Sequence, residues 1–213
     1  VSQMLNNRDK GTLYPGGIRK MKPSEIFELG KTYLDRAARH RMGAPFFTDK
    51  MPNNFAHIGL IATILPNAKI IDARRHPLDS CVGCFKQHWA LGQTYTYDMF
   101  ELGEFYLEYD SLMSHWDSVL PGKVLRVQYE DVIDDLETQV RSMLSFCNLS
   151  FEDSCLNFHK TKRSVATASS EQVRQPIYNK SVNSWKRFES HIEPLIEILE
   201  PILDTSDLTN IVR

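Results

Sequence analysis

Residues 69–80 read Lys-Ile-Ile-Asp-Ala-Arg-Arg-His-Pro-Leu-Asp-Ser, and this stretch decides the fold. The apolar residues between positions 70 and 73 predict a short buried strand, and Pro77 fixes φ for the first turn of a helix. Arg75 stands at the end of the strand. The N–H groups of the first helical turn, the positive end of the helix dipole and the guanidinium would converge on one point. The stretch therefore predicts a strand, a polar corner and a helix, with an anion as the natural ligand of the corner.

A structural ion pair is the alternative role for Arg75. In many α/β proteins an arginine at a strand end pairs with a carboxylate, which here would be Asp72 or Asp79. The sequence leaves both roles open, because it shows neither the burial nor the partners of the guanidinium.

The composition is that of an ordinary globular protein, with 42% hydrophobic and 24% charged residues among 213. This length predicts a single domain over residues 1–213. The net charge of −2 gives no support for bulk binding to nucleic acid or to a membrane surface, so an anion site has to be local. The sequence contains no apolar run long enough to span a bilayer and no signal-peptide pattern at its start.

Four cysteines are too few for a disulfide-built scaffold in a chain of this size, so reduced thiols are expected. Cys81 and Cys84 form one C-x-x-C, but no second pair at matching spacing and no nearby His-x-x-x-His completes a zinc site. At i and i+3 of a helix, the same pair places two small apolar side chains on one packing face. We expect packing rather than redox chemistry here, and no metal ion as cofactor.

Hydrophobic periodicity predicts helices that alternate with short strands. The predicted helices span residues 23–41, 57–65, 77–90, 97–120, 135–147, 155–160 and 182–203, the last one bent at Pro194, and Asp134 and Glu137 stand at capping-box spacing. The predicted strands span residues 46–48, 70–73 and 124–127. The alternation predicts an α/β fold with a short parallel sheet flanked by helices.

Polar side chains follow each of the three predicted strands. Lys50, Arg75 and Tyr129 come after separate strands, and the carboxyl ends of parallel strands meet at one edge of a sheet. The polar segment 161–179 has little periodic hydrophobicity and is long for a passive connector. We expect the three side chains to converge and the region from Ser169 to Ser181 to fold over the same edge.

Four motifs, in this order along the chain, carry a resemblance to a known family. They are Asp-Lys-Met-Pro-Asn-Asn-Phe at 49–55, Arg-His-Pro-Leu-Asp-Ser at 75–80, Val-Gln-Tyr-Glu-Asp at 127–131 and Ser-Ser-Glu-Gln-Val-Arg-Gln-Pro at 169–176, followed by Ser181 and Trp185. On these motifs the chain resembles the P-loop-like sulfotransferases, particularly the tyrosylprotein sulfotransferases and bacterial relatives that are often fused to tetratricopeptide repeats. The resemblance covers almost the whole chain and implies the P-loop NTPase-like sulfotransferase fold.

Enzymes of this family transfer the sulfuryl group of 3′-phosphoadenosine 5′-phosphosulfate (PAPS) to a hydroxyl or an amine. The resemblance implies this reaction here, with a protein, a glycan or a small molecule as acceptor. It implies that Arg75 binds the 3′-phosphate, that Tyr129 belongs to the same nucleotide pocket and that residues 169–181 close over the nucleotide. The other residues expected at the nucleotide are Ser80, Gly83, Ser169, Ser170, Gln172, Val173, Arg174, Tyr178, Ser181 and Ser184.

The resemblance assigns the chemistry to Lys50 and Ser169. Both would lie by the oxygen that bridges phosphate and sulfate, where they would stabilise the charge that develops as the bond to sulfur breaks. A compact ammonium suits a single oxygen, whereas the planar fork of Arg75 suits a terminal phosphate. On the isolated sequence, the favoured interpretation of Lys50 is a solvated lysine before a turn, and that of Ser169 is a loop hydroxyl or a helix cap.

Two positions depart from the pattern of the family. Its members usually carry a serine eight residues after the phosphate-binding arginine, where this chain has Gly83. Either one hydroxyl contact to the phosphate is lost, or Ser80 replaces it. The tyrosylprotein branch has a lysine immediately before the tryptophan of the last helix, where this chain has Ser184, so another basic residue would have to supply the charge.

Two family features have no counterpart in this sequence. They are the glycine-rich loop for the 5′-phosphosulfate after the first strand, and the glutamate that the tyrosylprotein branch uses as general base. The glycine pair at 16–17 has no strand before it and no Ser/Thr-led helix after it. We expect both features upstream of Val1, so that this chain is the carboxyl-terminal part of a sulfotransferase domain. Otherwise His57, His76 or His88 would serve as the base, although a lone helical histidine more often packs in a core.

Two other functions stay open at this point. A catalytically silent nucleotide-binding or interaction module fits Gly83 and the missing loop. A P-loop nucleoside kinase shares the architecture, but it would need a G-x-x-x-x-G-K-[ST] motif and carboxylates for magnesium, and neither is apparent. Few cysteines and bacterial relatives favour the cytoplasm over a Golgi lumen, and the same relatives suggest tetratricopeptide repeats or other sequence upstream.

Overall fold

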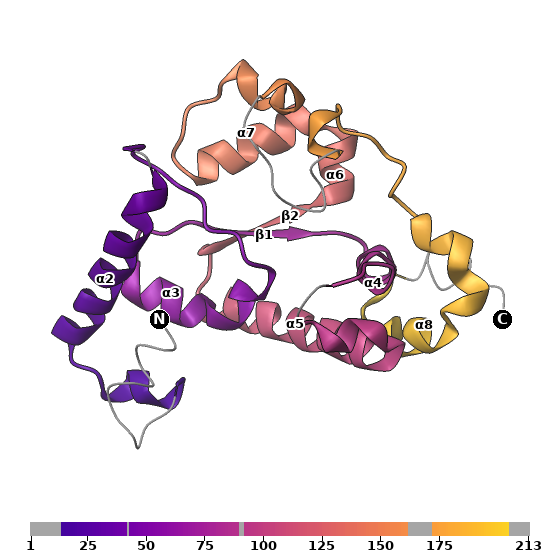
Figure 1. Ribbon diagram of the computed structural model, residues 1–213, viewed down its shortest axis with the longest axis horizontal. Helices are drawn as coiled ribbons and strands as arrows, with labels where there is room; N and C mark the ends of the chain where they lie inside the picture. The colour runs from indigo at the N-terminus through magenta and orange to yellow at the C-terminus, as the bar shows by residue number, and fades with distance from the viewer. Residues whose placement is uncertain (1–13, 42, 90–91, 162–171, 205–213) are drawn as a thin grey trace. The chain divides into compact units, whose positions relative to one another are not determined.

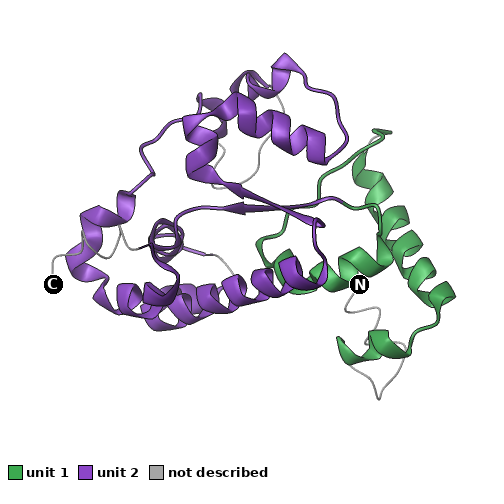
Figure 2. Cartoon of the chain, turned by 180° about the vertical axis from the view of Figure 1, so that it is seen from behind, with its two compact units in different colours: residues 1–68 green, residues 69–213 purple. Residues whose placement is uncertain are grey.

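The computed structural model describes residues 14–41, 43–89, 92–161 and 172–204 (Figure 1). The polypeptide forms two compact units, which comprise residues 1–68 and 69–213 (Figure 2). The expectation of a single domain over the whole chain stays a prediction. Within the described ranges, no helix is both long enough and apolar enough to cross a membrane.

The first unit is built on two packed helices. Helix α2 (Pro23–Arg41) is the helix predicted from the sequence, and α3 (Ile58–Ile64) falls within the predicted range 57–65. The short 3₁₀ helices η1 (Gly16–Lys20) and η2 (Pro52–His57) flank them. A Cβ atom at Gly30 would stand 2.1 Å from the carbonyl oxygen of Ile64, so only glycine at this position lets α2 approach α3 so closely.

The strand predicted at residues 46–48 is wrong. The structure gives this segment no regular secondary structure, and Phe46 is 66% exposed. Phe47 packs instead beside the ring of Tyr33, with ring centroids 6.4 Å apart, and lies 5.6 Å from the guanidinium carbon of Arg41. A strand needs a neighbour for its backbone hydrogen bonds, and the described part of the sheet contains none for this segment.

A two-stranded parallel sheet is the centre of the second unit. Strand β1 (Ile70–Arg74) pairs with β2 (Val124–Gln128) so that the last residues of the two strands, Arg74 and Gln128, stand opposite each other. Helices α4 (Pro77–Phe85), α5 (Met99–Val119) and α8 (Glu193–Leu199) lie on one side of the strands in Figure 1, and α6 (Tyr129–Asp134) and α7 (Leu136–Phe146) lie on the other. The predicted α/β class with a short parallel sheet is confirmed.

Strand β1 is buried on one face only. Ile70, Asp72 and Arg74 alternate with the more exposed Ile71 and Ala73, and Ile71 is 41% exposed. The sequence predicted a buried apolar strand, but the inward face carries a carboxylate and a guanidinium. Charged side chains on this face need partners, which α5 supplies.

The structure differs from the predicted helices at the end of α4, at the cap of α7 and by the additional helix α6. Helix α4 ends at Phe85, where the backbone of Trp89 and the hydroxyl of Tyr97 hydrogen-bond to each other in place of further helical turns. Asp135 rather than Asp134 caps α7: its carboxylate accepts the N–H of Thr138 at 3.0 Å, and hydrogen bonds from Thr138 lower the pKa of this exposed carboxyl. Tyr129 begins α6, a short helix that the sequence did not predict.

The C-terminal helix predicted over residues 182–203 consists of separate pieces. A 3₁₀ helix, η7 (Ser184–His191), is followed by α8, and Pro194 occupies the first turn of α8. Proline donates no N–H and therefore marks the start of a new helix. The predicted bend at Pro194 is therefore a break between two helices.

The core of the second unit lies between α4, α5 and the C-terminal helices. Its buried side chains include Leu78, Cys81, Val82, Leu102, Trp185, Leu195 and Leu199. A Cβ atom at Gly103 would stand 2.8 Å from Cγ2 of Ile198, so glycine allows α5 and α8 to pack closely. Cys84 packs against this core beside Cys81, and burial raises the pKa of both thiols. Phe85, the last residue of α4, is 38% exposed.

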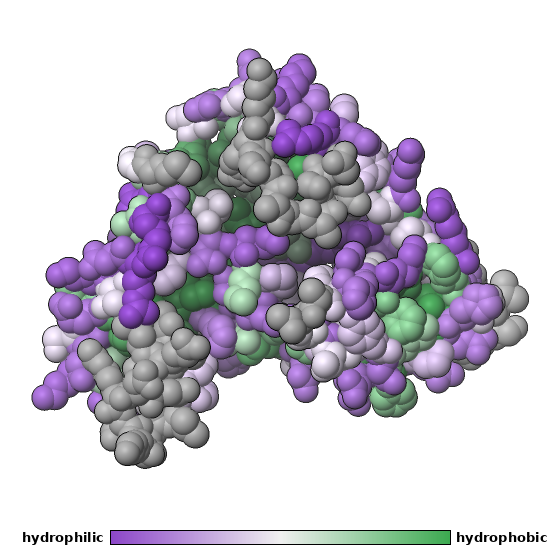
Figure 3. All heavy atoms as spheres, viewed as in Figure 1, coloured by the Kyte–Doolittle hydropathy of each residue, from purple (hydrophilic) through white to green (hydrophobic). Residues whose placement is uncertain are grey.

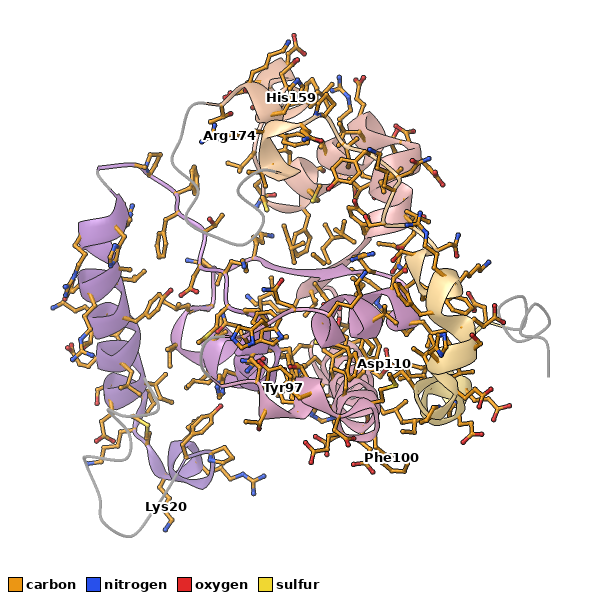
Figure 4. The ribbon with its side chains drawn as sticks, turned by 45° about the vertical axis from the view of Figure 1, so that its right-hand side comes forward. Lys20, Tyr97, Phe100, Asp110, His159 and Arg174 are labelled. Atoms are coloured by element: carbon orange, nitrogen blue, oxygen red, sulfur yellow. The ribbon has the colours of Figure 1, made fainter. Side chains whose placement is uncertain are left out.

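A network of charged groups fills the space between β1 and α5. Arg74, whose side chain is 8% exposed, donates from Nε to Asp72 and from Nη1 to Asp110, both at 2.6 Å. The hydroxyl of Tyr109 donates to the other oxygen of Asp72 at 2.7 Å, and the Tyr109 ring lies 4.9 Å from the guanidinium carbon. Figure 4 labels Asp110 on α5. Each buried carboxylate therefore has the guanidinium or hydroxyl partner that burial requires.

Substitution of Arg74 by alanine should destabilise the protein strongly. The change leaves Asp72 and Asp110 without their cation in a buried setting, and such a loss costs about 3–5 kcal/mol in the free energy of unfolding, measured by urea denaturation. Arg126→Ala is the matched control, because it breaks an ion pair with Asp117 in which both side chains are about half exposed. That loss should stay under about 1 kcal/mol. Equal losses in the two variants would contradict a structural role for the Arg74 network.

Candidate functional site

A sharp corner joins β1 to α4. Arg75 follows the last residue of β1, His76 is the N-cap of α4, and Pro77 is its first residue, as the sequence predicted. The N–H of His76 donates to Oε1 of Glu130 at 3.0 Å, and the amide of Gln128 donates to Oε2 of the same carboxylate at 2.7 Å. Glu130 thereby fixes the corner from the neighbouring strand end. This role of Glu130 was not predicted, and the only signal for it in the sequence is its position directly after Tyr129.

Arg75 is the cation of the corner. Its Nη2 donates to the carbonyl oxygen of Ser181 at 2.8 Å, and its guanidinium carbon lies 5.2 Å from the centroid of the Tyr129 ring. The Nε–H is buried and meets no hydrogen-bond acceptor among the residues that the structure describes. The side chain as a whole is 30% exposed. Arg75 is therefore held by the protein on one side and retains hydrogen-bonding capacity that the described residues do not use.

Tyr129 brings the segment before Ser181 to the same place. Its hydroxyl lies 3.3 Å from the carbonyl oxygen of Tyr178 and 3.3 Å from the hydroxyl of Ser181. Tyr129 follows β2 just as Arg75 follows β1, so the parallel pairing brings the two side chains together. The predicted approach of Arg75, Tyr129 and the segment that ends at Ser181 is present in the structure.

The two carboxylates considered as partners of Arg75 differ in their contacts. Asp72 binds Arg74 and Tyr109. Asp79 lies 3.9 Å from Nη2 of Arg75, at the outer limit of an ion pair, and accepts a hydrogen bond from the hydroxyl of Ser184 at 2.8 Å. The hydroxyl of Ser184, which was expected at the nucleotide, is thus directed to Asp79.

Gly83 and Ser80 lie on α4, the helix that follows Arg75. A Cβ atom at Gly83 would stand 3.9 Å from Nη1 of Arg75, which is ordinary van der Waals contact. A side chain at this exposed position would thus border the guanidinium without a clash. Ser80 is half-buried, and its N–H donates to the carbonyl oxygen of His76 at 2.9 Å.

The remaining residues expected at the nucleotide lie before Ser181. Val173 and Arg174 belong to the 3₁₀ helix η6 (Gln172–Arg174), and Arg174 Nη1 donates to the carbonyl oxygen of Thr161 at 3.4 Å. Figure 4 shows Arg174 near His159 of η5 (Phe158–Lys160). Ser169, Ser170 and the side chain of Gln172 lie outside the described residues.

Lys50 belongs to the first unit and is exposed. Its neighbour Asp49 accepts hydrogen bonds from the hydroxyl of Tyr33 at 2.6 Å and from the amide of Asn54 at 3.4 Å, which hold this turn on α2. Because residues 46–48 form no strand, Lys50 does not follow a strand end. Its approach to Arg75 stays a prediction.

The three histidines considered as general bases have different surroundings. His57 Nδ1 lies 2.8 Å from the hydroxyl of Tyr14 in the first unit. The ring of His76 stacks on Trp185 with centroids 5.7 Å apart, and His88 is exposed. The structure thus shows a hydrogen-bonded, a stacked and an exposed imidazole, and none of these contacts identifies a base.

An apolar hollow of about 300 Å³ lies on the other end of α4, and its wall includes Val82, Phe85, Phe188 and Leu195. The ammonium of Lys86 at its border lies 4.6 Å from the centroid of the Phe188 ring. Apolar side chains of this part of the surface are visible beside the C-terminal helices in Figure 3. The residues that line this hollow do not include Arg75, Tyr129 or Ser181, so the hollow is separate from the Arg75 corner. Among the described residues, no group of three or more His, Cys, Asp or Glu is placed to hold a metal ion.

Three matches to known proteins bear on the family and the fold of this chain. The family model described as "Sulfotransferase family" matches residues 19–153. An uncharacterized protein of Aquifex aeolicus (strain VF5) is 35% identical over 211 residues, which cover 94% of this chain and 28% of the relative. The chain therefore spans little more than a quarter of the length of that relative.

The third match is a solved structure, the sulfotransferase domain from the curacin biosynthetic pathway. It superposes with a TM-score of 0.53 at 15% sequence identity, over 82% of this chain and 67% of that one. At this identity the match shows a common fold.

Proposed function

The chain belongs to the sulfotransferase family, and we propose that it transfers the sulfuryl group of PAPS to a hydroxyl or an amine of an acceptor molecule. In this proposal, the corner after β1 binds the 3′-phosphate of the nucleotide. The acceptor class stays open among proteins, glycans and small molecules, because acceptor specificity depends on loops rather than on the fold.

The state of Arg75 is the observation that carries the proposal. Its guanidinium stands at the carboxyl end of a parallel strand, directly before a helix N-terminus, and its buried Nε–H has no acceptor in the described part of the chain. A buried donor without an acceptor costs about 1–3 kcal/mol, and a terminal phosphate would remove that cost with a charge-assisted hydrogen bond. The stack on Tyr129 fixes the plane of the fork.

The segment that ends at Ser181 favours a nucleotide over free phosphate as the ligand of the corner. Tyr129 and Arg75 both bind this segment, which therefore covers the corner with polar backbone and a hydroxyl. We propose that Ser80, Ser169, Ser170 and residues 172–181 complete the nucleotide pocket. The hydroxyl of Ser184 binds Asp79 and would act on the nucleotide only through that carboxylate.

For the chemical step, we propose Lys50 and Ser169 as the residues at the bridging oxygen. The bond between this oxygen and sulfur breaks while a bond forms from the acceptor oxygen to sulfur, and the acceptor proton passes to a base. Negative charge develops on the departing phosphate oxygen, where an ammonium and a hydroxyl donor lower the barrier. We assign no residue of this chain as the base or as a ligand of the 5′-phosphosulfate.

The setting of the reaction is part of the same proposal. The four cysteines are free thiols, which supports the cytoplasm over an oxidising lumen.

A second function has one observation in its favour: the absence of a hydroxyl at Gly83 fits a catalytically silent nucleotide-binding or interaction module. Nucleotide binding by itself does not separate the two, but sulfuryl transfer does.

Substitution of Arg75 by alanine should weaken binding of adenosine 3′,5′-bisphosphate by about 10- to 100-fold, because hydrogen bonds to a charged group contribute about 1.5–3 kcal/mol. Isothermal titration calorimetry measures the change. Arg126→Ala, which removes an exposed guanidinium on β2, should leave the affinity within about twofold. No binding by the unsubstituted protein would favour the interaction module, and an unchanged affinity in Arg75→Ala would rule out this phosphate site.

Substitution of Gly83 by serine should strengthen binding of the same nucleotide by about 3- to 10-fold, since it adds one hydroxyl donor beside the phosphate. The Cβ atom fits at 3.9 Å from Arg75. Gly83→Ala is the control, because it adds the same Cβ atom and also removes the helix penalty of glycine, but it brings no hydroxyl. Equal affinities of the serine and alanine variants would show that no phosphate oxygen lies near position 83.

Substitution of Lys50 by methionine should reduce the release of labelled sulfate from PAPS by at least about 100-fold, because the change removes the cation from the departing oxygen and keeps an unbranched side chain only one atom shorter. Transfer to water as the acceptor makes the assay independent of the natural substrate. The affinity for adenosine 3′,5′-bisphosphate should change little. Lys31→Met, at an exposed position of α2, is the control, and equal rates in both variants would exclude Lys50 from the reaction.

A further inference from the structure

Asp79 is a fully buried carboxylate on the first turn of α4, and its side chain is 0% exposed. It accepts three hydrogen bonds from consecutive residues of a distant segment. The backbone N–H of Asn183 donates at 2.7 Å, the hydroxyl of Ser184 at 2.8 Å and the backbone N–H of Trp185 at 2.9 Å. A charged group this deeply buried requires such donors, so Asp79 and residues 183–185 are fixed to each other.

The same carboxylate faces the cation of the corner. Nη2 of Arg75 lies 3.9 Å from Oδ2 of Asp79, and this nitrogen also donates to the carbonyl oxygen of Ser181. Ser181 lies only two positions before Asn183, the first of the residues that donate to Asp79. Asp79 therefore acts on the guanidinium in two ways, through its charge and through the backbone that carries the Ser181 carbonyl.

The backbone at Asn183 indicates how firmly this segment is held. Asn183 has a φ of 56°, in the left-handed region that few residues other than glycine adopt. The turn points its N–H at Asp79, in the shortest of the three hydrogen bonds. A backbone conformation of this kind persists where surrounding contacts determine it, which here are the contacts with Asp79.

We propose that Asp79 is a positioning residue for phosphate recognition. It aligns the guanidinium of Arg75 and holds residues 183–185 on α4. Binding of the 3′-phosphate and placement of the preceding residues 178–181 therefore occur together. This inference rests on the proposed function. It differs from a purely structural role, in which Asp79 would only stabilise the core around Trp185 and would affect every nucleotide equally.

The test compares two nucleotides that differ by one group. Adenosine 3′,5′-bisphosphate and adenosine 5′-monophosphate are titrated calorimetrically into the 213-residue chain. The Kd for the monophosphate divided by the Kd for the bisphosphate measures recognition of the 3′-phosphate. Asp79→Asn keeps the size of the side chain but removes its charge. It also directs the amide NH₂ at one of the groups that donate hydrogen bonds to Asp79 in the original protein. We expect the ratio to fall at least 10-fold, with the Kd for the monophosphate within about threefold of its original value.

Two further variants separate positioning from stability. Thr96→Val removes a buried hydroxyl that donates to the carbonyl oxygen of Gln93 at 2.8 Å, and it should lower stability without changing the ratio. Ser184→Ala removes one donor of Asp79 and leaves the charge, and it should lower the ratio by about threefold. If Asp79→Asn does not fold, Ser184→Ala is the deciding variant.

Each outcome decides the proposal. A ratio preserved in Asp79→Asn, or in Ser184→Ala where the first variant does not fold, overturns positioning and leaves the role of Arg75 intact. Equal loss of both nucleotides in Asp79→Asn also overturns it, in favour of a structural role. If the unsubstituted protein does not prefer the bisphosphate, the proposed function fails and this inference fails with it.

Discussion

The parallel pairing of β1 with β2 is the constraint on which the candidate site depends. With Arg74 opposite Gln128, the next residue of each strand, Arg75 and Tyr129, leaves the sheet at the same edge. The hydrogen bond from the N–H of His76 to Glu130 then joins the segments that follow β1 and β2. A shift of one residue in this register would separate the guanidinium from the aromatic ring and turn the charged face of β1 away from α5.

Buried charge rather than apolar area specifies the geometry around this sheet. Arg74 fixes α5 to β1 through Asp72 and Asp110, and Asp79 fixes the C-terminal segment to α4. An apolar contact tolerates small displacements, but a buried carboxylate keeps its free energy only while its donors stay within hydrogen-bond distance. These groups therefore set the relative positions of the backbone segments within the second unit.

The sequence predicted those parts of the fold that depend on local chemistry. The alternation of strands and helices, with Pro77 after a polar corner, predicted β1, β2 and their parallel pairing correctly. Residues 46–48 looked like a strand because their apolar composition is the same whether or not a pairing partner exists. The role of Asp79 depends on contacts with residues more than one hundred positions away, which no local pattern contains.

Two adjacent arginines of β1 and its exit serve unrelated purposes. Arg74 binds two carboxylates and its side chain is 8% exposed, whereas the side chain of Arg75 is 30% exposed at the edge of the sheet. Each of the two guanidiniums has one buried nitrogen without an acceptor among the described residues. Alternation along a strand sends neighbouring side chains to different surroundings, and here it directs Arg74 to the interior and Arg75 to the edge where the phosphate is proposed to bind. A saturation-mutagenesis survey scored by survival would register both positions as intolerant. Intolerance at position 74 would then report on a loss of folding stability. Under the proposed function, only the signal at position 75 would carry information about a ligand.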